Sequence, residues 1–166
     1  MESIDKTIEI EAAVSDVYAR WSRFESFPEF MEGIEEVRQL DEKHLHWVMQ
    51  MAGKKKEWDS EITEHIPDQR ISWRSTQGAL TFGTVSFTSK DHQHTLLRLQ
   101  MQYELESAAE KAADALGLVS RRIESNLERF RAMMENRSRQ SGSERSQNAE
   151  PTLVRGYGTS GKSGLS

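Results

Sequence analysis

The chain has 166 residues, 36% of them hydrophobic and 30% charged, which is enough for one domain and a tail. The absence of cysteine excludes a disulfide scaffold, a thiolate metal site and a cysteine nucleophile. The net charge of −5 argues against nucleic acid as the main partner.

The N-terminal stretch MESIDKTIEI alternates apolar and polar residues, with Ile4, Ile8 and Ile10 on one face. This period predicts a half-buried strand. The stretch lacks the apolar segment of an export signal, and nowhere do enough apolar residues run together to cross a membrane, so we expect a soluble cytoplasmic protein.

Two short helices are predicted next. Ser15, or the residue before it, can cap the first helix, whose apolar side carries Val14, Val17, Tyr18 and Trp21. Pro28, in FESFPEFM, ends that helix and starts another brief helical turn.

After Gly33 the period of two returns and predicts six further strands joined by short hairpins. The strand signals at residues 45–51, 58–62, 71–73, 80–89 and 95–105 mark five of them. Between them, Gly53 and the lysines of GKKKE predict a hairpin tip, and Pro67-Asp68 and DHQH predict turns. The expected arrangement is an antiparallel meander.

From Ser107 to about Arg137 an apolar stripe recurs with a period of 3.6 residues and predicts one long helix. Gly117 lies near the middle of this stripe, where glycine costs up to about 1 kcal/mol relative to alanine. We therefore expect a bend, or a looser first half, near Gly117.

Residues 138–166 differ from the rest, because they are rich in glycine and serine, slightly basic and poor in apolar residues. We expect a folded domain at 1–137 and a disordered tail at 138–166. Within the tail, GYGTSGKS at 156–163 matches the pattern of a phosphate-binding loop. A working loop joins a buried strand to a helix, and neither can be placed here, so we interpret the match as a result of composition.

This order of elements is the helix-grip arrangement of the α+β class, in which a curved antiparallel sheet of seven strands wraps around a long C-terminal helix. Three stretches, IEIEAAVSDVYARWSRFESFPEFMEGIEEV, KEWDSEITEHIPDQRISWRSTQG and LERFRAMMENR, resemble the START-like (SRPBCC) superfamily. The resemblance is to its polyketide cyclase/dehydrase branch, which also includes coenzyme Q-binding proteins. It covers about residues 3 to 137 and implies an apolar cavity between sheet and helix that holds a lipid, quinone or polyketide.

Large apolar side chains on the inner faces are the candidate lining of that cavity, although any one of them can instead fill the core. The candidates are Phe27, Trp47, Met49, Trp58, Trp73, Phe82, Leu99, Met101, Tyr103, Leu116, Val119, Ile123 and Leu127. Tyr103 and the tryptophan N–H groups are the expected polar contacts for a ligand.

Catalytic and metal-binding chemistry finds little support in the residue pattern. The histidine pairs His44/His46 and His92/His94 are each two apart, but no third ligand accompanies them, so no metal or other cofactor is expected. The inward face offers Ser60, Ser75 and Tyr103, whereas Glu61, Arg74, Arg98 and Glu104 are expected to point outward. This shortage of inward ionisable groups predicts a carrier with no catalytic residues.

The sequence thus favours binding or transport of a hydrophobic small molecule. A polyketide cyclase or dehydratase acting in the same cavity, and an interaction module, stay open as alternatives. The run Lys54 to Lys56 is interpreted as a solvated hairpin tip, and transient contact of these lysines with an anionic membrane surface is the alternative. The identity of the ligand and the oligomeric state are not specified by the sequence.

Overall fold

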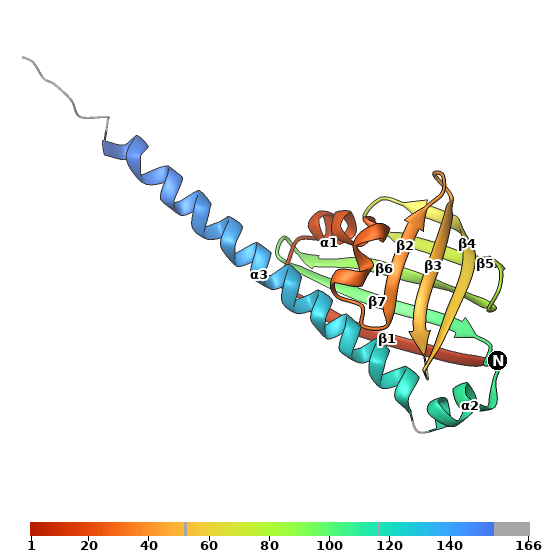
Figure 1. The fold of residues 1–166 in the computed structure, drawn as a ribbon. Helices are drawn as coiled ribbons and strands as arrows, with labels where there is room; N and C mark the ends of the chain where they lie inside the picture. Colours follow the sequence, from red (N-terminus) through yellow and green to blue (C-terminus); the bar gives the residue numbers. More distant parts are fainter. Residues whose placement is uncertain (52, 116, 155–166) are drawn as a thin grey trace, which may run out of the picture.

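The computed structural model describes residues 1–51, 53–115 and 117–154. Its strands form one antiparallel sheet in the order β1-β7-β6-β5-β4-β3-β2 (Figure 1). Their bounds are β1 Glu2–Ile10, β2 Ile34–Gln39, β3 His44–Met51, β4 Lys54–Ile66, β5 Arg70–Gln77, β6 Thr81–Asp91 and β7 His94–Tyr103. Strands β2 to β7 are neighbours in chain order, and β1 pairs with β7 at the edge opposite β2. The predicted seven-stranded sheet is confirmed.

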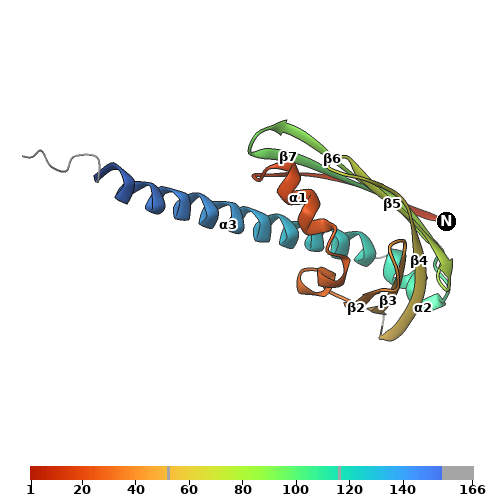
Figure 2. The ribbon, with the colours of Figure 1, turned by 90° about the horizontal axis from the view of Figure 1, so that it is seen from above.

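Figure 2 shows that the sheet curls and that the first part of the long helix α3, Leu118–Val154, runs along its concave side, whereas the C-terminal part extends beyond the sheet. The two short helices predicted after the first strand are confirmed as α1, Val14–Trp21, and the 3-10 helix η1, Phe24–Glu29. The prediction that Ser15 or the residue before it caps this helix is wrong, because the N-cap position is held by Ala13, whose side chain makes no hydrogen bond. The fold is therefore the helix-grip arrangement. None of the described helices is long and apolar enough to cross a membrane.

The core lies where α1, η1 and α3 meet the concave face of the sheet. Alternate residues of neighbouring strands supply its fully buried side chains, which include Ile10, Leu45, Ile71, Val85 and Leu97. The sheet can bury one face in this way because successive strand residues point to opposite sides.

α3 contributes Leu127, Phe130 and Met134 to the core, and all three are buried. Phe130 packs edge-on against Trp21 of α1, with 5.1 Å between the ring centroids. This aromatic contact joins the C-terminal helix to the N-terminal one.

The single helix predicted from Ser107 is broken at Gly117, where we expected a bend. α2, Ala108–Ala115, ends just before this residue and α3 begins just after it. Gly117 has a φ of +74°, which is a left-handed conformation that glycine adopts more readily than other residues. The chain can therefore change direction between the two helices, as Figure 1 shows.

The prediction that this helix ends at about Arg137 is wrong, because α3 continues to Val154. The segment is rich in Arg, Glu and Gln, which favour helix, and no proline precedes Pro151 in it. Residues 136–140 are exposed, and the last buried side chain described on α3 is that of Met134. Residues 155–166, with the GYGTSGKS pattern, lie outside the described part.

Truncation after Arg137 tests the division into domain and tail. Since the removed segment contributes no described buried side chain, the free energy of unfolding should change by less than about 0.5 kcal/mol. A second truncation after Glu128 removes Phe130 and Met134 and should cost more than about 3 kcal/mol. Urea unfolding followed by tryptophan fluorescence measures both. Equal losses in the two truncated chains would contradict the proposed boundary.

Candidate ligand-binding cavity

A cavity of about 740 Å³ lies between the concave face of the sheet and the first turns of α3. Its wall is built mainly from η1, β3, β4, β5, β7 and α3, with single residues from α1, β2, β6 and α2. The volume falls within the usual range for small-molecule sites, about 300 to 1,000 Å³. The fold therefore leaves space beside its core for a ligand.

Eleven of the thirteen residues expected at the cavity line it in the structure. They are Phe27, Trp47, Met49, Trp58, Trp73, Leu99, Met101, Tyr103, Val119, Ile123 and Leu127. Leu116 lies outside the described residues. The remaining one, Phe82, is 36% exposed and is not part of the wall, so its expected position is wrong.

Phe82 points outward because the inner positions of β6 are those of the buried Val85 and Phe87, two and four residues from Gly83. Gly83 holds the inner position opposite Trp73. A Cβ atom on Gly83 would lie 2.9 Å from Cη2 of Trp73 and 2.5 Å from the backbone oxygen of Gln100. The missing side chain thus makes room for the Trp73 indole.

Stacked indoles form one side of the cavity. The rings of Trp47 and Trp58 are nearly parallel, with an interplanar angle of 4° and 5.6 Å between centroids. Phe27 of η1 packs beside Trp47, with centroids 5.7 Å apart. Nε1 of Trp47 donates a hydrogen bond of 2.8 Å to Oγ of the buried Ser60. The Trp47 N–H, expected to contact a ligand, is therefore already satisfied.

The cavity wall also carries charged groups that the sequence reading missed. Lys56, expected at a solvated hairpin tip, lies within β4 on the same face as Trp58 and lines the cavity. Its Nζ lies 2.7 Å from Oε1 of Glu110 and 3.5 Å from Oε2 of Glu106. The side chains of Lys56 and Glu110 are only 14% and 5% exposed. The prediction that few ionisable groups point inward is therefore wrong.

Glu110 is held as a carboxylate by its neighbours. Burial raises its pKa, but the hydrogen bond from Lys56 and backbone N–H groups of Glu106 and Ser107 outweigh burial and hold the pKa below its ordinary value. One of these bonds runs 2.7 Å from the Glu106 nitrogen to Oε2 of Glu110. Ser107 caps α2 by accepting the N–H of Glu110 at 3.1 Å. The Glu110 side chain thus takes part both in the ion pair with Lys56 and in hydrogen bonding at the start of α2.

Tyr103 is a further polar group of the wall, and its partner also lies on α2. Its hydroxyl donates a hydrogen bond of 2.6 Å to Oδ1 of Asp114. Burial, followed by the hydrogen bond and charge of Asp114, raises the pKa of Tyr103 well above its ordinary value. The phenol therefore stays protonated, with its proton directed at Asp114.

α2 is attached to the sheet through these acidic side chains. Among its described side chains Glu110 is the buried one, and Asp114 is half-buried. Their partners, Lys56 on β4 and Tyr103 on β7, come from separate strands. Two polar contacts thus place α2 against the cavity wall.

Asn126 of α3 fixes the loop that follows η1. Its Oδ1 accepts the backbone N–H of Glu32 at 2.9 Å, and Arg129 pairs with the Glu32 carboxylate at 3.1 Å. Arg122 donates to the backbone oxygen of Gln50 at 3.1 Å and thereby ties α3 to β3.

The sequence did not identify Asn126, Trp21 and Phe24 as lining residues, although all three line the cavity. The positions of Trp21 and Phe24 on the apolar sides of α1 and η1 were the signal available.

The outer face of the sheet carries most of the remaining charges. Arg74 pairs with Glu61 at 3.0 Å and Arg98 pairs with Asp5 at 2.7 Å, so Glu61, Arg74 and Arg98 point outward as expected. Glu104 is exposed as well, and it borders the cavity at the end of β7. Ser75 accepts the backbone N–H of Thr81 at 3.0 Å and is occupied by that contact.

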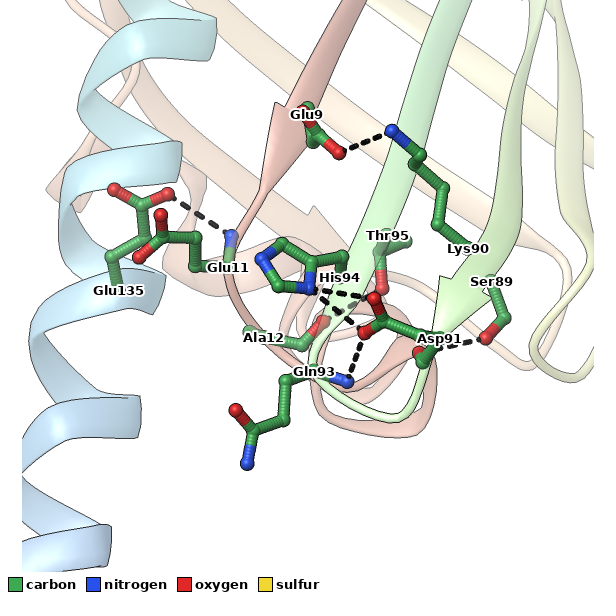
Figure 3. Close-up of polar contacts among 10 residues, drawn as sticks. All are labelled: Glu9, Glu11, Ala12, Ser89, Lys90, Asp91, Gln93, His94, Thr95 and Glu135. Carbon is green, nitrogen blue, oxygen red and sulfur yellow. Dashed lines mark hydrogen bonds and ion pairs between the residues drawn. The ribbon is translucent and has the colours of Figure 1, made fainter.

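Three of the four histidines considered as metal ligands contact carboxylates. Figure 3 shows His94 beside Asp91 at the turn between β6 and β7, with Nδ1 2.8 Å from Oδ1. His46 lies 2.6 Å from Asp59, and this hydrogen bond raises the pKa of His46. His44 contacts Asp41 at 2.9 Å. In residues 1–51, 53–115 and 117–154, no three His, Asp or Glu side chains are grouped so as to hold a metal ion.

The sequence matches a known protein family and a protein of similar length. Residues 10–131 match the family described as "Polyketide cyclase / dehydrase and lipid transport". A 17.2 kDa protein from Streptomyces lincolnensis is 40% identical over 143 residues, which cover 86% of this chain and 95% of the relative.

Solved structures share the fold at low identity. The Zhui aromatase/cyclase from a Streptomyces species superposes with a TM-score of 0.74 at 18% identity, over 85% of this chain and 98% of that one. A START superfamily protein from Mycobacterium smegmatis gives 0.62 at 17% identity, over 77% and 98%.

The close approach at Gly83 predicts a strong effect of adding one methyl group. Gly83→Ala places a Cβ against the backbone oxygen of Gln100 and should destabilise the domain by about 1 to 3 kcal/mol while displacing Trp73. Urea unfolding and near-ultraviolet circular dichroism measure the two effects. Thr88→Ala, at an exposed position of the same strand, is the control and should cost less than about 0.5 kcal/mol. Equal costs would show that the site relaxes freely.

The lowered pKa of Glu110 predicts a pH dependence of stability. The carboxylate stabilises the fold above the pKa of the unfolded chain, and this contribution disappears as the pH falls through the lower folded-state value. Glu110→Gln should therefore cost about 1 to 2 kcal/mol at about pH 7, and this cost should shrink as the pH falls through the folded-state pKa of Glu110. Chemical unfolding at about pH 7 and at progressively lower pH, with the outer-face variant Glu61→Gln as the control, tests this. A cost for Glu110→Gln that does not depend on pH would be the contrary result.

Proposed function

The chain belongs to the polyketide cyclase/dehydrase and lipid transport family, and on that basis we propose that it binds or carries a hydrophobic small molecule. The observation that carries the proposal is the cavity of about 740 Å³ between sheet and α3, with its largely apolar wall. The proposed ligand contacts are the eleven lining residues predicted from the sequence, from Phe27 to Leu127. No metal or other cofactor is included in the proposal.

The character of the wall favours a lipid, a quinone or a polyketide-like molecule. The parallel indoles of Trp47 and Trp58 offer flat apolar surface, which suits a ligand with conjugated rings. Met31, Met49 and Met101 lie around the same space, and methionine side chains adapt readily to ligands of different shape. The fold itself does not choose among these classes.

A cyclase or dehydratase acting in the same cavity is the second candidate. The observation in its favour is that Lys56, Glu110 and Tyr103 place ionisable groups in a largely apolar wall. An ammonium group can stabilise a developing enolate oxygen, and a neighbouring carboxylate can accept a proton. Turnover of a poly-β-ketone substrate that is lost in Lys56→Met would establish the enzyme. Saturable binding without turnover supports the carrier.

We further propose that ligand transfer takes place in the cytoplasm, through transient contact with an anionic membrane surface. Gly53 lines the cavity and is followed by Lys54 and Lys55, which are both exposed. A cation near such a surface gains about 1 kcal/mol. Sedimentation with vesicles that contain phosphatidylserine, compared with neutral vesicles, tests this contact. Equal sedimentation with both would contradict it.

Filling the cavity should abolish binding without unfolding the domain. Ile123 lines the cavity from α3 and is only partly buried, so Ile123→Trp replaces ligand space with an indole. Its affinity for the fluorescent apolar probe N-phenylnaphthylamine should fall at least about tenfold, the equivalent of roughly 1.4 kcal/mol. Competition by fatty acids, quinones and aromatic polyketides then ranks the ligand classes.

The matched control for this experiment is Phe82→Ala. Phe82 is an aromatic side chain of the same sheet that points away from the cavity, so the variant should bind the probe like the wild-type chain. Thermal unfolding shows whether each variant is folded. Loss of binding in both variants, or in neither, would contradict the cavity as the binding site.

A further inference from the structure

Lys56 is the feature of the cavity from which the specificity of the site can be inferred. We propose that Lys56, neutralised by Glu110, binds the oxygen-bearing end of the ligand and selects an uncharged acceptor such as a ketone or quinone carbonyl. This inference rests on the proposed function, because it assigns one end of the ligand to one place in the same cavity.

The position of Lys56 differs from that of the other cations in the wall. Arg121 and Arg122 also line the cavity, but both are exposed. The Lys56 side chain is 14% exposed and follows the inner face of β4, two residues before Trp58. It is therefore the cation most withdrawn from water among the described residues of the wall.

The ammonium group has capacity for a further hydrogen bond. It carries three N–H donors, and Glu110 accepts one of them at 2.7 Å. The second carboxylate, that of Glu106, lies 3.5 Å away, at the limit of hydrogen-bond distance. Both oxygens of Glu110 already accept a hydrogen bond, Oε1 from Lys56 and Oε2 from the Glu106 backbone N–H at 2.7 Å. Glu110 is also the less exposed member of the pair, so the group that we assign to a ligand is the Lys56 donor.

Charge decides which oxygen this donor prefers. Glu110 already balances Lys56, so a ligand carboxylate would place a second negative charge beside Glu110 in poorly hydrated surroundings. Like charges at such distances repel strongly when water does not screen them. A carbonyl oxygen adds no net charge and still accepts a charge-assisted hydrogen bond. The site is therefore suited to a neutral oxygen.

The same geometry orients the ligand. Residues two apart along a strand are about 7 Å apart on one face, so the Trp58 indole lies next to Lys56 along the cavity. Trp58 stacks on Trp47, which continues the aromatic wall toward Phe27. A ligand with its carbonyl at Lys56 would lay its apolar body along these rings.

Three naphthalene derivatives of similar size test the inference. Acetylnaphthalene carries a ketone, ethylnaphthalene replaces it with an alkyl group, and naphthoate carries a carboxylate. Tryptophan quenching should show that the wild-type chain binds the ketone about tenfold more tightly than either of the other two. Lys56→Met should remove the preference for the ketone over ethylnaphthalene. Lys55→Met, one position along and exposed, is the matched control and should keep it.

Two further variants separate charge from folding. Glu110→Gln removes the buried carboxylate beside Lys56 and leaves only the exposed Glu106 near it, so the affinity for naphthoate should rise about tenfold relative to the ketone. The double variant Lys56→Met with Glu110→Gln leaves no unpaired charge behind and should bind the ketone and ethylnaphthalene equally. Retention of the ketone preference in this double variant would overturn the assignment of Lys56.

The outcomes distinguish this inference from the proposed function. If the wild-type chain binds all three probes with equal affinity, the cavity is a binding site and the role of Lys56 is wrong. If none of the three binds saturably, the proposed function fails together with the inference. If naphthoate binds the wild-type chain most tightly, the selection of an uncharged oxygen is wrong.

Discussion

The packing of α3 against the sheet is the interaction on which the rest of the molecule depends. Over Leu127, Phe130 and Met134 the helix is buried against the sheet, α1 and η1, and this contact forms the core. Toward its start, Val119 and Ile123 are only partly buried and line open space. The cavity exists because the close contact at one end of α3 is not continued to the other.

The break at Gly117 completes the cavity. An uninterrupted helix would carry residues 108–115 straight on, whereas the left-handed glycine allows α2 to turn toward the sheet. α2 then meets Lys56 and Tyr103 through two carboxylates. A wall closed by polar contacts is easier to open than one closed by buried apolar side chains, because water can replace each hydrogen bond. The buried ion pair of Lys56 and Glu110 lies where α2 meets the wall.

The sequence predicted the parts of the fold that follow from a regular period. Inner positions such as Trp47, Trp58 and Met101 could be assigned because alternation in a strand determines the face. Phe82 was placed on the wrong face because its size outweighed the neighbouring Gly83, whose lack of a side chain matters only once Trp73 is packed against it. Lys56 was missed because three successive lysines resemble a hairpin tip. Glu110 was missed because its burial depends on where α2 turns, which no local pattern specifies.

The central claim is that a hydrophobic molecule occupies this cavity, and methionine methyl groups report on it directly. Met31, Met49 and Met101 line the cavity, whereas Met134 is buried in the core outside the wall. Titration of methyl-labelled protein with a quinone or fatty acid, followed by nuclear magnetic resonance, should shift the first three resonances saturably and leave that of Met134 almost unchanged. Shifts confined to other methionines, or no saturable shift with any ligand class, would contradict the account.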